Sequence, residues 1–255
     1  MLRTMVKQQT GGCGMAARVH EGAGPSLVLH LHGGAFGGSL EGGAAVAGTL
    51  AAAGATVHSV DYPCGAAHPF PDAIEAVYVA LAALAGKRQR VPLFVAGEEA
   101  GGNMAAGLAL MCRDRLGPKL AGQILLSPML DPRLGTCSAR DAEAGMAGCK
   151  WAMGWRDYLR SAETINHPYA APALATRLAG LPPALLVTGP HDPLADETAE
   201  YGRRLRASGV DVVECRITEG EAWPDALLAP AADAAWAGTL RRAAHDFYQR
   251  CAVHC

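Results

Sequence analysis

A glycine-framed turn carries a glutamate at the point where a nucleophile would be expected. The apolar residues Leu93–Ala96 are followed by the sequence GEEAG at residues 97–101 and then by a run of small residues. This is the frame of a nucleophile elbow, G-x-S-x-G, in which a sharp strand-to-helix turn exposes a serine. The two glycines are present, but the central position holds Glu99. The stretch therefore predicts an elbow that lacks its usual nucleophile.

A glycine-rich loop earlier in the chain could supply the second half of such a site. The residues His32, Gly33, Gly34 and Ala35 follow the apolar run Ser26–Leu31. They match the H-G-G-G type of loop, whose glycines let backbone N–H groups converge on a developing oxyanion. Alone, the loop could be a tight turn into a helix. With the elbow further along the chain, it favours an oxyanion loop.

Apolar runs of strand length alternate with helix-like segments along the chain. Strands are predicted at Ala16–His20, Ser26–Leu31, Thr56–Val60, Leu93–Ala96, Gln123–Ser127, Ala184–Thr188 and Val210–Arg216. Helices are predicted at Gly43–Ala53, Asp72–Ala85, Gly101–Arg115, Trp151–Ser161, Glu197–Ser208 and Ala231–Arg250. Strands that are apolar throughout and alternate with helices predict an α/β fold with a mostly parallel central sheet flanked by helices. Sites in such sheets lie beyond the carboxyl ends of the strands.

Length and composition fit one domain. The chain has 255 residues, half of them hydrophobic, which is enough to bury a sheet on both faces. We expect a single domain over residues 1–255. Residues 128–170 are rich in Met, Trp and Gly and too long for a plain loop, so they are expected to form a lid-like insertion.

Several motifs in chain order resemble the bacterial hormone-sensitive-lipase-like esterases, a branch of the α/β-hydrolase fold. These motifs are HGGAF at 32–36, VDY at 60–62, HPFP at 68–71, the elbow with AGGN at 100–103, SPMLD at 127–131, PYAAP at 168–172 and DPLADE at 192–197. The resemblance covers most of the chain. It implies the α/β-hydrolase fold and hydrolysis of short-chain carboxylic esters by a Ser–Asp–His triad. The N-terminal cap expected here is short, whereas the family usually carries a longer lead-in that covers the site.

Carried over by position, the triad is degenerate. The acid falls on Asp192, the nucleophile position on Glu99, and the histidine position on Trp223. We therefore expect an esterase or lipase homologue that lacks ordinary carboxylesterase activity and binds a small hydrophobic or ester-like ligand or a partner. The alternative is an active hydrolase of small esters or related substrates that uses Glu99 as an atypical base or nucleophile. A third interpretation is a scaffold subunit that acts as a homodimer.

The elbow suits an anion even without serine. Glu99 is expected at a helix N-terminus, where the dipole is positive. We hypothesise that its carboxylate fills the oxyanion hole and accepts the N–H groups of Gly33, Gly34 and Ala100. His32, Ala35 and Glu98 complete the predicted oxyanion and ligand-binding residues.

Other residues near the predicted site have alternative interpretations. His191 precedes Asp192 and is either an ordinary loop histidine or a replacement base. Ser39 and Ser127 lie outside any elbow and are expected to be structural. Glu98 and Glu99 could be imagined to bind a hard cation with His191 and Asp192, but adjacent residues at an elbow point in different directions, so no metal is expected.

Composition excludes several classes of partner. The net charge of −2 and the short basic runs do not favour nucleic acid. We find no G-x-G-x-x-G opening a helix after the first strand and no Walker A motif, so no cofactor is expected. No run reaches the length of a membrane span and no signal peptide is evident, so a cytoplasmic protein is expected. The eight cysteines form no C-x-x-C pair, and the tail at 251–255 is expected to bind no metal.

Overall fold

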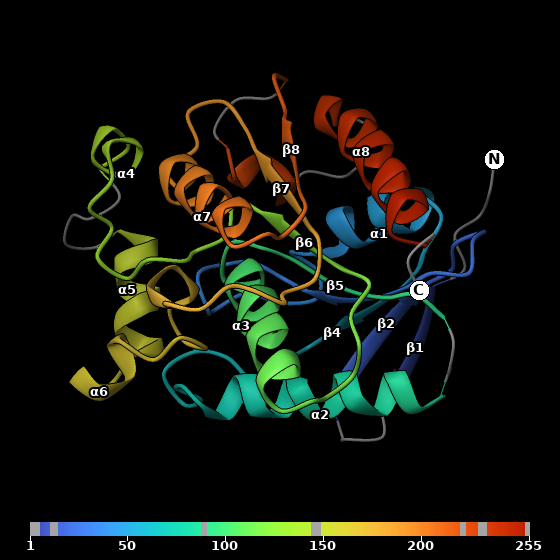
Figure 1. Ribbon diagram of the computed structural model, residues 1–255, viewed down its shortest axis with the longest axis horizontal. Helices are drawn as coiled ribbons and strands as arrows, with labels where there is room; N and C mark the ends of the chain where they lie inside the picture. The colour runs from blue at the N-terminus through green and yellow to red at the C-terminus, as the bar shows by residue number, and fades with distance from the viewer. Residues whose placement is uncertain are drawn as a thin grey trace.

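A computed structural model of the chain describes residues 6–10, 15–87, 91–143, 149–219, 223–228 and 234–252. Eight strands form one sheet in the order β1-β2-β4-β3-β5-β6-β7-β8, with helices on both faces (Figure 1). The strands are β1 (Val6–Thr10), β2 (Ala16–His20), β3 (Leu27–Leu31), β4 (Thr56–Val60), β5 (Leu93–Glu98), β6 (Gly122–Leu126), β7 (Ala184–Thr188) and β8 (Val212–Arg216). From β4 through β8 every neighbouring pair is parallel, whereas β1–β2 and β2–β4 are antiparallel. The mostly parallel sheet predicted from the sequence is confirmed.

The helices enclose two cores, one on each face of the sheet. They are α1 (Ala44–Ala52), α2 (Asp72–Lys87), α3 (Ala100–Asp114), α4 (Cys137–Asp141), α5 (Lys150–Tyr158), α6 (Ala162–Ile165), α7 (Ala195–Ala207) and α8 (Ala235–Ala252). The first core contains side chains of α2, α3, α5 and α7, and the second contains side chains of α1 and α8. In β5, Leu93 and Val95 face the first core while Phe94 faces the second. This alternation is the strand period, and it explains why such strands are apolar at every position.

The boundaries differ from the sequence predictions in a few places. The polar strand β1 was not predicted, because its sequence VKQQT lacks an apolar run. The strand β5 continues two residues further, to Glu98, so the elbow turn is confined to Glu99. The helix expected from Ala231 is described from Ala235 onward, and residues 231–233 lie outside the described part.

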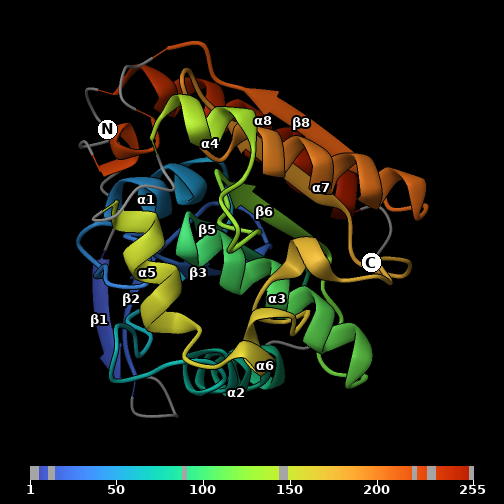
Figure 2. The same ribbon diagram turned by 90° about the vertical axis from the view of Figure 1, so that its left-hand side faces the viewer.

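The stretch 128–170 holds the three short helices α4, α5 and α6. The helix predicted at Trp151–Ser161 is observed as α5, which lies on the side of the molecule that faces the viewer in Figure 2. Its residue Tyr158 stacks on Phe36 with ring centroids 4.1 Å apart, and Trp155 lies 5.3 Å from the same ring. The loop after β3 and the helix α5 therefore pack directly together.

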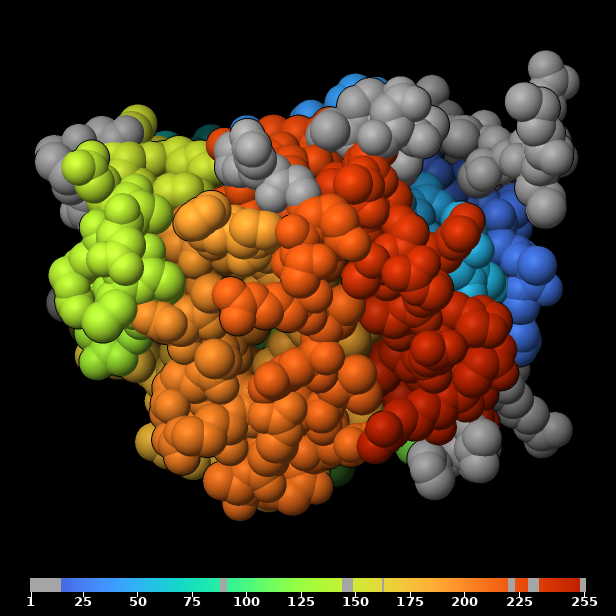
Figure 3. Space-filling model, turned by 90° about the horizontal axis from the view of Figure 1, so that it is seen from above, coloured from blue at the N-terminus to red at the C-terminus, as the bar shows by residue number. Residues whose placement is uncertain are grey.

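The C-terminal part of the chain, from α7 to α8, covers most of the face seen in Figure 3. No helix in the described ranges has both the length and the apolar character needed to cross a membrane.

Candidate active site

The predicted elbow is present, with a glutamate at its tip. Glu99 lies between β5 and α3 with φ 48° and ψ −114°, and its carbonyl accepts the N–H groups of Met129 and Asn103. A Cβ on Gly101 would overlap the carbonyl of Leu31, so only glycine lets α3 start this close to the end of β3. The turn therefore directs the side chain of Glu99 toward the loop that follows β3.

The carboxylate of Glu99 is held by three donors. Oε2 accepts the backbone N–H of Gly34 at 2.8 Å, and Oε1 accepts the indole N–H of Trp151 at 3.1 Å. The Nζ atom of Lys150 lies 3.0 Å from Oε1. Glu99 is only 5% exposed, so these donors replace the water that a carboxylate would otherwise bind.

The neighbouring carboxylate of Glu98 uses the adjacent amide. Its Oε1 accepts the N–H of Gly33 at 3.0 Å, and its Oε2 lies 2.8 Å from Nε2 of His30. The expectation that Gly33 donates to Glu99 is therefore wrong, as is the expected bond from Ala100, whose N–H makes no bond to this carboxylate within the described residues. The physical reason is the length of β5: as the last strand residue, Glu98 continues the strand alternation and lies on the same face of the sheet as Phe94 and Ala96, where it reaches His30 and the N–H of Gly33.

The loop after β3 is fixed by His32 and by positive backbone angles. The His32 ring stacks on Tyr62 at 4.3 Å, and the Tyr62 hydroxyl donates to the His32 carbonyl at 2.8 Å. Burial lowers the pKa of His32 below its usual range, although the hydrogen bond to the Gly33 carbonyl and the nearby carboxylates of Glu98 and Asp61 act in the opposite direction. Gly34 has φ +88°, which favours glycine, and Ala35 has φ 49°. The loop is thus set to direct its N–H groups at the two glutamates.

Asp192 is linked to Trp223 through Ser127. The Ser127 hydroxyl donates to Oδ2 of Asp192 at 2.6 Å and accepts the indole N–H of Trp223. Burial raises the pKa of Asp192 to about 6, although the hydrogen bond from Ser127 and the N–H of Leu194 act in the opposite direction. Trp223 is 3% exposed, and its indole lies against Gly189, where a Cβ would overlap the ring. The acid position therefore contacts a serine, and the histidine position is filled by an indole.

Sequence reasoning missed Ser127 and Lys150, among other residues at this site. Ser127 was expected to be structural, and Lys150 was not considered. Lys150 contacts Glu99 and also the carboxylate of Asp225, which lies in a 3₁₀ helix, η2 (Asp225–Leu228), just after Trp223. Burial alone would lower the pKa of Lys150, but the carboxylates of Glu99 and Asp225 outweigh it and raise that pKa. The only sequence signal was that Lys150 is the sole lysine of the 128–170 stretch.

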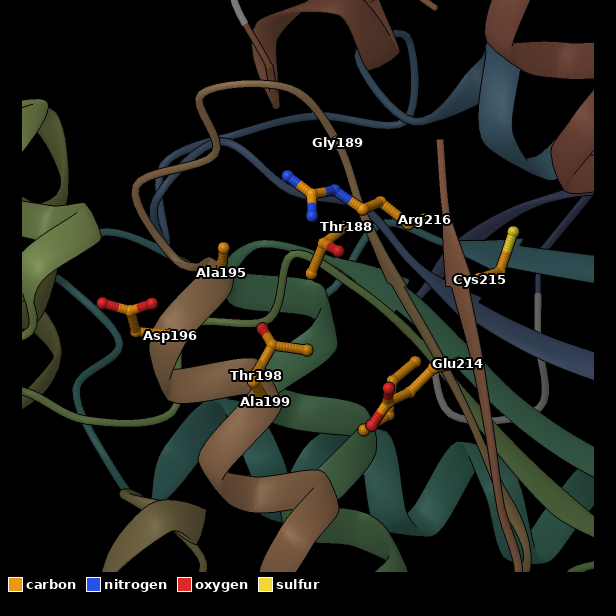
Figure 4. Close-up of a pocket in the computed structure, with 10 residues that line it drawn as sticks. Thr188, Gly189, Ala195, Asp196, Thr198, Ala199, Glu214, Cys215 and Arg216 are labelled. Atoms are coloured by element: carbon orange, nitrogen blue, oxygen red, sulfur yellow. The ribbon is translucent and has the colours of Figure 1, made fainter. Parts of the chain in front are cut away.

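The structure does not bring His191 to Glu99. His191 is exposed with φ 54°, and it makes no hydrogen bond to Glu99 within the described residues. It lines a cavity of about 270 Å³ beside Asp192 and Arg216. A cavity of about 320 Å³ adjoins this one between α7 and the ends of β7 and β8, where Thr188 and Arg216 are register partners (Figure 4).

In the ranges that the structure describes, no group of three or more His, Cys, Asp or Glu side chains is placed to hold a metal ion. The tail at residues 253–255, which includes two of the side chains considered for a metal, lies outside those ranges.

Comparison with known proteins identifies the family. A model of the alpha/beta hydrolase fold family matches residues 28–223. Esterase LipI of Mycobacterium tuberculosis is 35% identical over 206 residues, which are 73% of this chain and 61% of LipI. The structure of a hyperthermophilic esterase from the archaeon Pyrobaculum calidifontis has a TM-score of 0.81 at 30% identity and covers 98% of this chain and 86% of that chain.

A receptor is also among the similar proteins. The gibberellin receptor GID1B of Arabidopsis thaliana is 28% identical over 174 residues, which are 62% of this chain and 48% of the receptor. The first curated relatives, including LipI, are longer than this chain, which spans about 60% of their length. By the family match and the extent of these similarities, the chain belongs to the alpha/beta hydrolase fold family and is a homologue of its esterases.

Proposed function

We propose that this chain is a pseudoenzyme of the esterase family, with Glu99 in place of the serine and Trp223 in place of the histidine, that binds a small ligand or partner. The observation that carries the proposal is the hydrogen bond from Gly34 to the Glu99 carboxylate. An oxyanion hole stabilises charge that develops on a substrate oxygen, and an N–H group that already donates to the Glu99 side chain is not free to bind that oxygen.

The alternative, that Glu99 is itself a base or nucleophile, has less support. Both oxygens of its carboxylate already accept hydrogen bonds or an ion pair, so neither can meet a substrate without first losing a partner. An ester intermediate on a carboxylate would also need a base to activate water. His191 makes no contact with Glu99 within the described residues, and Trp223 has no basic nitrogen.

A binding role is supported by the name of one similar protein, which is called a gibberellin receptor. We propose a small ligand that is hydrophobic or ester-like. We also propose that the chain forms a homodimer, which size-exclusion chromatography with light scattering would test. The lid-like role of residues 128–170 within a single domain is part of the same proposal, supported by the contacts of Lys150 and Trp151 with Glu99.

The test is hydrolysis of short p-nitrophenyl esters by the wild-type protein, Glu99→Ser and Glu99→Ser/Trp223→His. We expect no turnover above background in the wild type or in the single variant, because a serine without a histidine base stays protonated. A gain in the double variant alone would support the loss of the triad. Wild-type turnover that Glu99→Gln abolishes would overturn the proposal.

A further inference from the structure

The donors around Glu99 form a complete binding site for a carboxylate. We call them the Glu99 seat: the backbone N–H of Gly34, the indole N–H of Trp151 and the ammonium of Lys150, which lie 2.8, 3.1 and 3.0 Å from the carboxylate oxygens. Charge-assisted hydrogen bonds of this kind are about twice as strong as neutral ones. The three donors come from the loop after β3 and from the first turn of α5, so neither segment alone forms the seat.

The carboxylate in this seat belongs to the chain itself. Its position is set by the elbow, whose backbone is fixed by hydrogen bonds from Met129 and Asn103 to the Glu99 carbonyl. The donors Lys150 and Trp151 belong to another element, and the ammonium of Lys150 also lies 4.7 Å from the centroid of the Trp151 ring. Removing the side chain of Glu99 would therefore leave an ammonium and two N–H groups without their common acceptor.

Apolar side chains flank the ionic part of this region. Met153 is one helical turn after Lys150 on α5, and Leu228 follows Asp225 by three residues in a 3₁₀ helix, where side chains three apart eclipse. Met153 and Leu228 are 43% and 58% exposed and are among the few large apolar side chains at the described surface. Leu228 also lies 3.6 Å from the position of a Cβ on Gly42. The Lys150–Asp225 ion pair is thus bordered by apolar surface on both of its elements.

We propose that the Glu99 seat is a binding site for aliphatic monocarboxylates, in which the Glu99 side chain is a tethered competitor. This deepens the proposed function and rests on it, because a hydrolase that uses Glu99 chemically would need the carboxylate free. A tethered group competes at a high effective concentration, so the wild type binds free carboxylates weakly. A ligand carboxylate that takes the seat meets Gly34, Trp151 and Lys150, while its chain extends toward Met153 and Leu228.

Calorimetric titration with sodium hexanoate tests this site on the full chain. We expect Glu99→Ala to bind hexanoate at least about tenfold more tightly than the wild type, since the competitor is gone. Adding Lys150→Met to Glu99→Ala should weaken binding about tenfold or more, because the ammonium is the charged donor. Adding Lys119→Met, at an exposed lysine without a described ion pair, should leave the affinity unchanged.

Hexanamide has the same aliphatic chain but no charge. Comparing it with hexanoate shows whether binding depends on the carboxylate or only on an apolar cavity that the substitution creates. The proposal is overturned if Glu99→Ala gains no affinity for hexanoate, if hexanamide gains as much, or if Lys150→Met has no effect. If Glu99→Ala does not fold, Glu99→Gly must show the same ranking, because it also empties the seat and suits the positive φ of 48° at this position. Ester hydrolysis measured on the same proteins distinguishes the two failures: wild-type turnover refutes the proposed function, whereas an inactive protein without hexanoate binding refutes only this site.

Discussion

The backbone N–H of Gly34 donates to Oε2 of Glu99 across the gap between the loop after β3 and the elbow, at 2.8 Å. A carbonyl oxygen of an ester gains negative charge only as it reacts, whereas the Glu99 side chain accepts this N–H before any substrate is present. The Gly34 N–H is therefore already paired with the Glu99 carboxylate when no ligand is bound. Any ligand that uses this N–H has to displace a side chain rather than water.

Replacing Lys150 by methionine should lower the free energy of unfolding by about 1–3 kcal/mol. The variant leaves the buried carboxylate of Glu99 with two donors and removes the ion pair with Asp225, and the 38% exposure of the Lys150 side chain limits the cost. Urea denaturation measures the change. Lys119→Met is the matched control and should change the stability by less than about 0.5 kcal/mol; equal effects of the two variants would contradict the importance of this contact.

Ser127→Ala should break the link between Trp223 and Asp192. The indole N–H loses its acceptor and the carboxylate loses a donor, so we expect a loss of about 1–3 kcal/mol in stability. The pKa of Asp192 should rise further above about 6, because the Ser127 hydrogen bond lowers it in the native protein. Carboxyl ¹³C NMR titration measures that pKa. Trp223→Phe keeps the Ser127–Asp192 bond, so it should shift this pKa much less.

Gly189→Ala should destabilise the protein by about 1–3 kcal/mol, the usual cost of overpacking. The added methyl group would overlap the indole of Trp223, which is buried and hydrogen-bonded. Thermal unfolding measures the loss. The control is Gly86→Ala in α2, where a Cβ meets no atom and helix propensity favours alanine by up to about 1 kcal/mol. In a Trp223→Ala background the cost of Gly189→Ala should largely vanish.

Stability should fall as the pH rises, because of Glu197. Burial raises the pKa of this carboxyl from 4.5 to about 8, although its Oε1 accepts the N–H of Leu130 at 2.6 Å. Between these values the folded state binds more protons than the unfolded state, so the stabilising contribution is fully present below pH 4.5 and is lost as the pH rises through about 8.

The slope from this one group is at most about 1.4 kcal/mol per pH unit. Denaturation at a series of pH values, compared between the wild type and Glu197→Gln, isolates it from other titrations. The stability difference between the two proteins should change between pH 5 and 8, whereas Glu163→Gln, at an exposed position, should give a constant difference. A pH-independent difference for Glu197→Gln would show that this carboxyl titrates normally.

Local patterns in the sequence predicted most of the sheet and the backbone of the site. Apolar runs located β2 to β8, and the glycines at 97 and 101 located the elbow, because each of these signals lies within a short stretch. The polar strand β1 had no such signal, since its partner β2 supplies the pairing. The Gly34–Glu99 bond was also expected, because the His-Gly-Gly loop and the elbow together match the two halves of an oxyanion hole.

Contacts between distant segments were not predictable in the same way. Lys150 reaches Glu99 from a helix in the 128–170 stretch, and no spacing rule relates those two positions. Ser127 joins Asp192 to Trp223 because β6 and β7 are neighbours in the sheet, which the sequence order alone does not state. The division of the two amides between Glu98 and Glu99 depended on one strand boundary, which sequence patterns place only to within a few residues.

The positive φ of Glu99 has a consequence for how this family can change. A residue with a Cβ in that conformation costs of order 1–3 kcal/mol, and in an esterase the cost is usually attributed to the chemistry of the serine. Here position 99 has the same kind of bend, although its residue is glutamate and not serine. The bend therefore arises from the junction of β5 and α3, and it holds the side chain of residue 99 in the same position whatever that residue is. A substitution at this position can therefore change the role of the protein, while the backbone of the elbow and the elements around it stay the same.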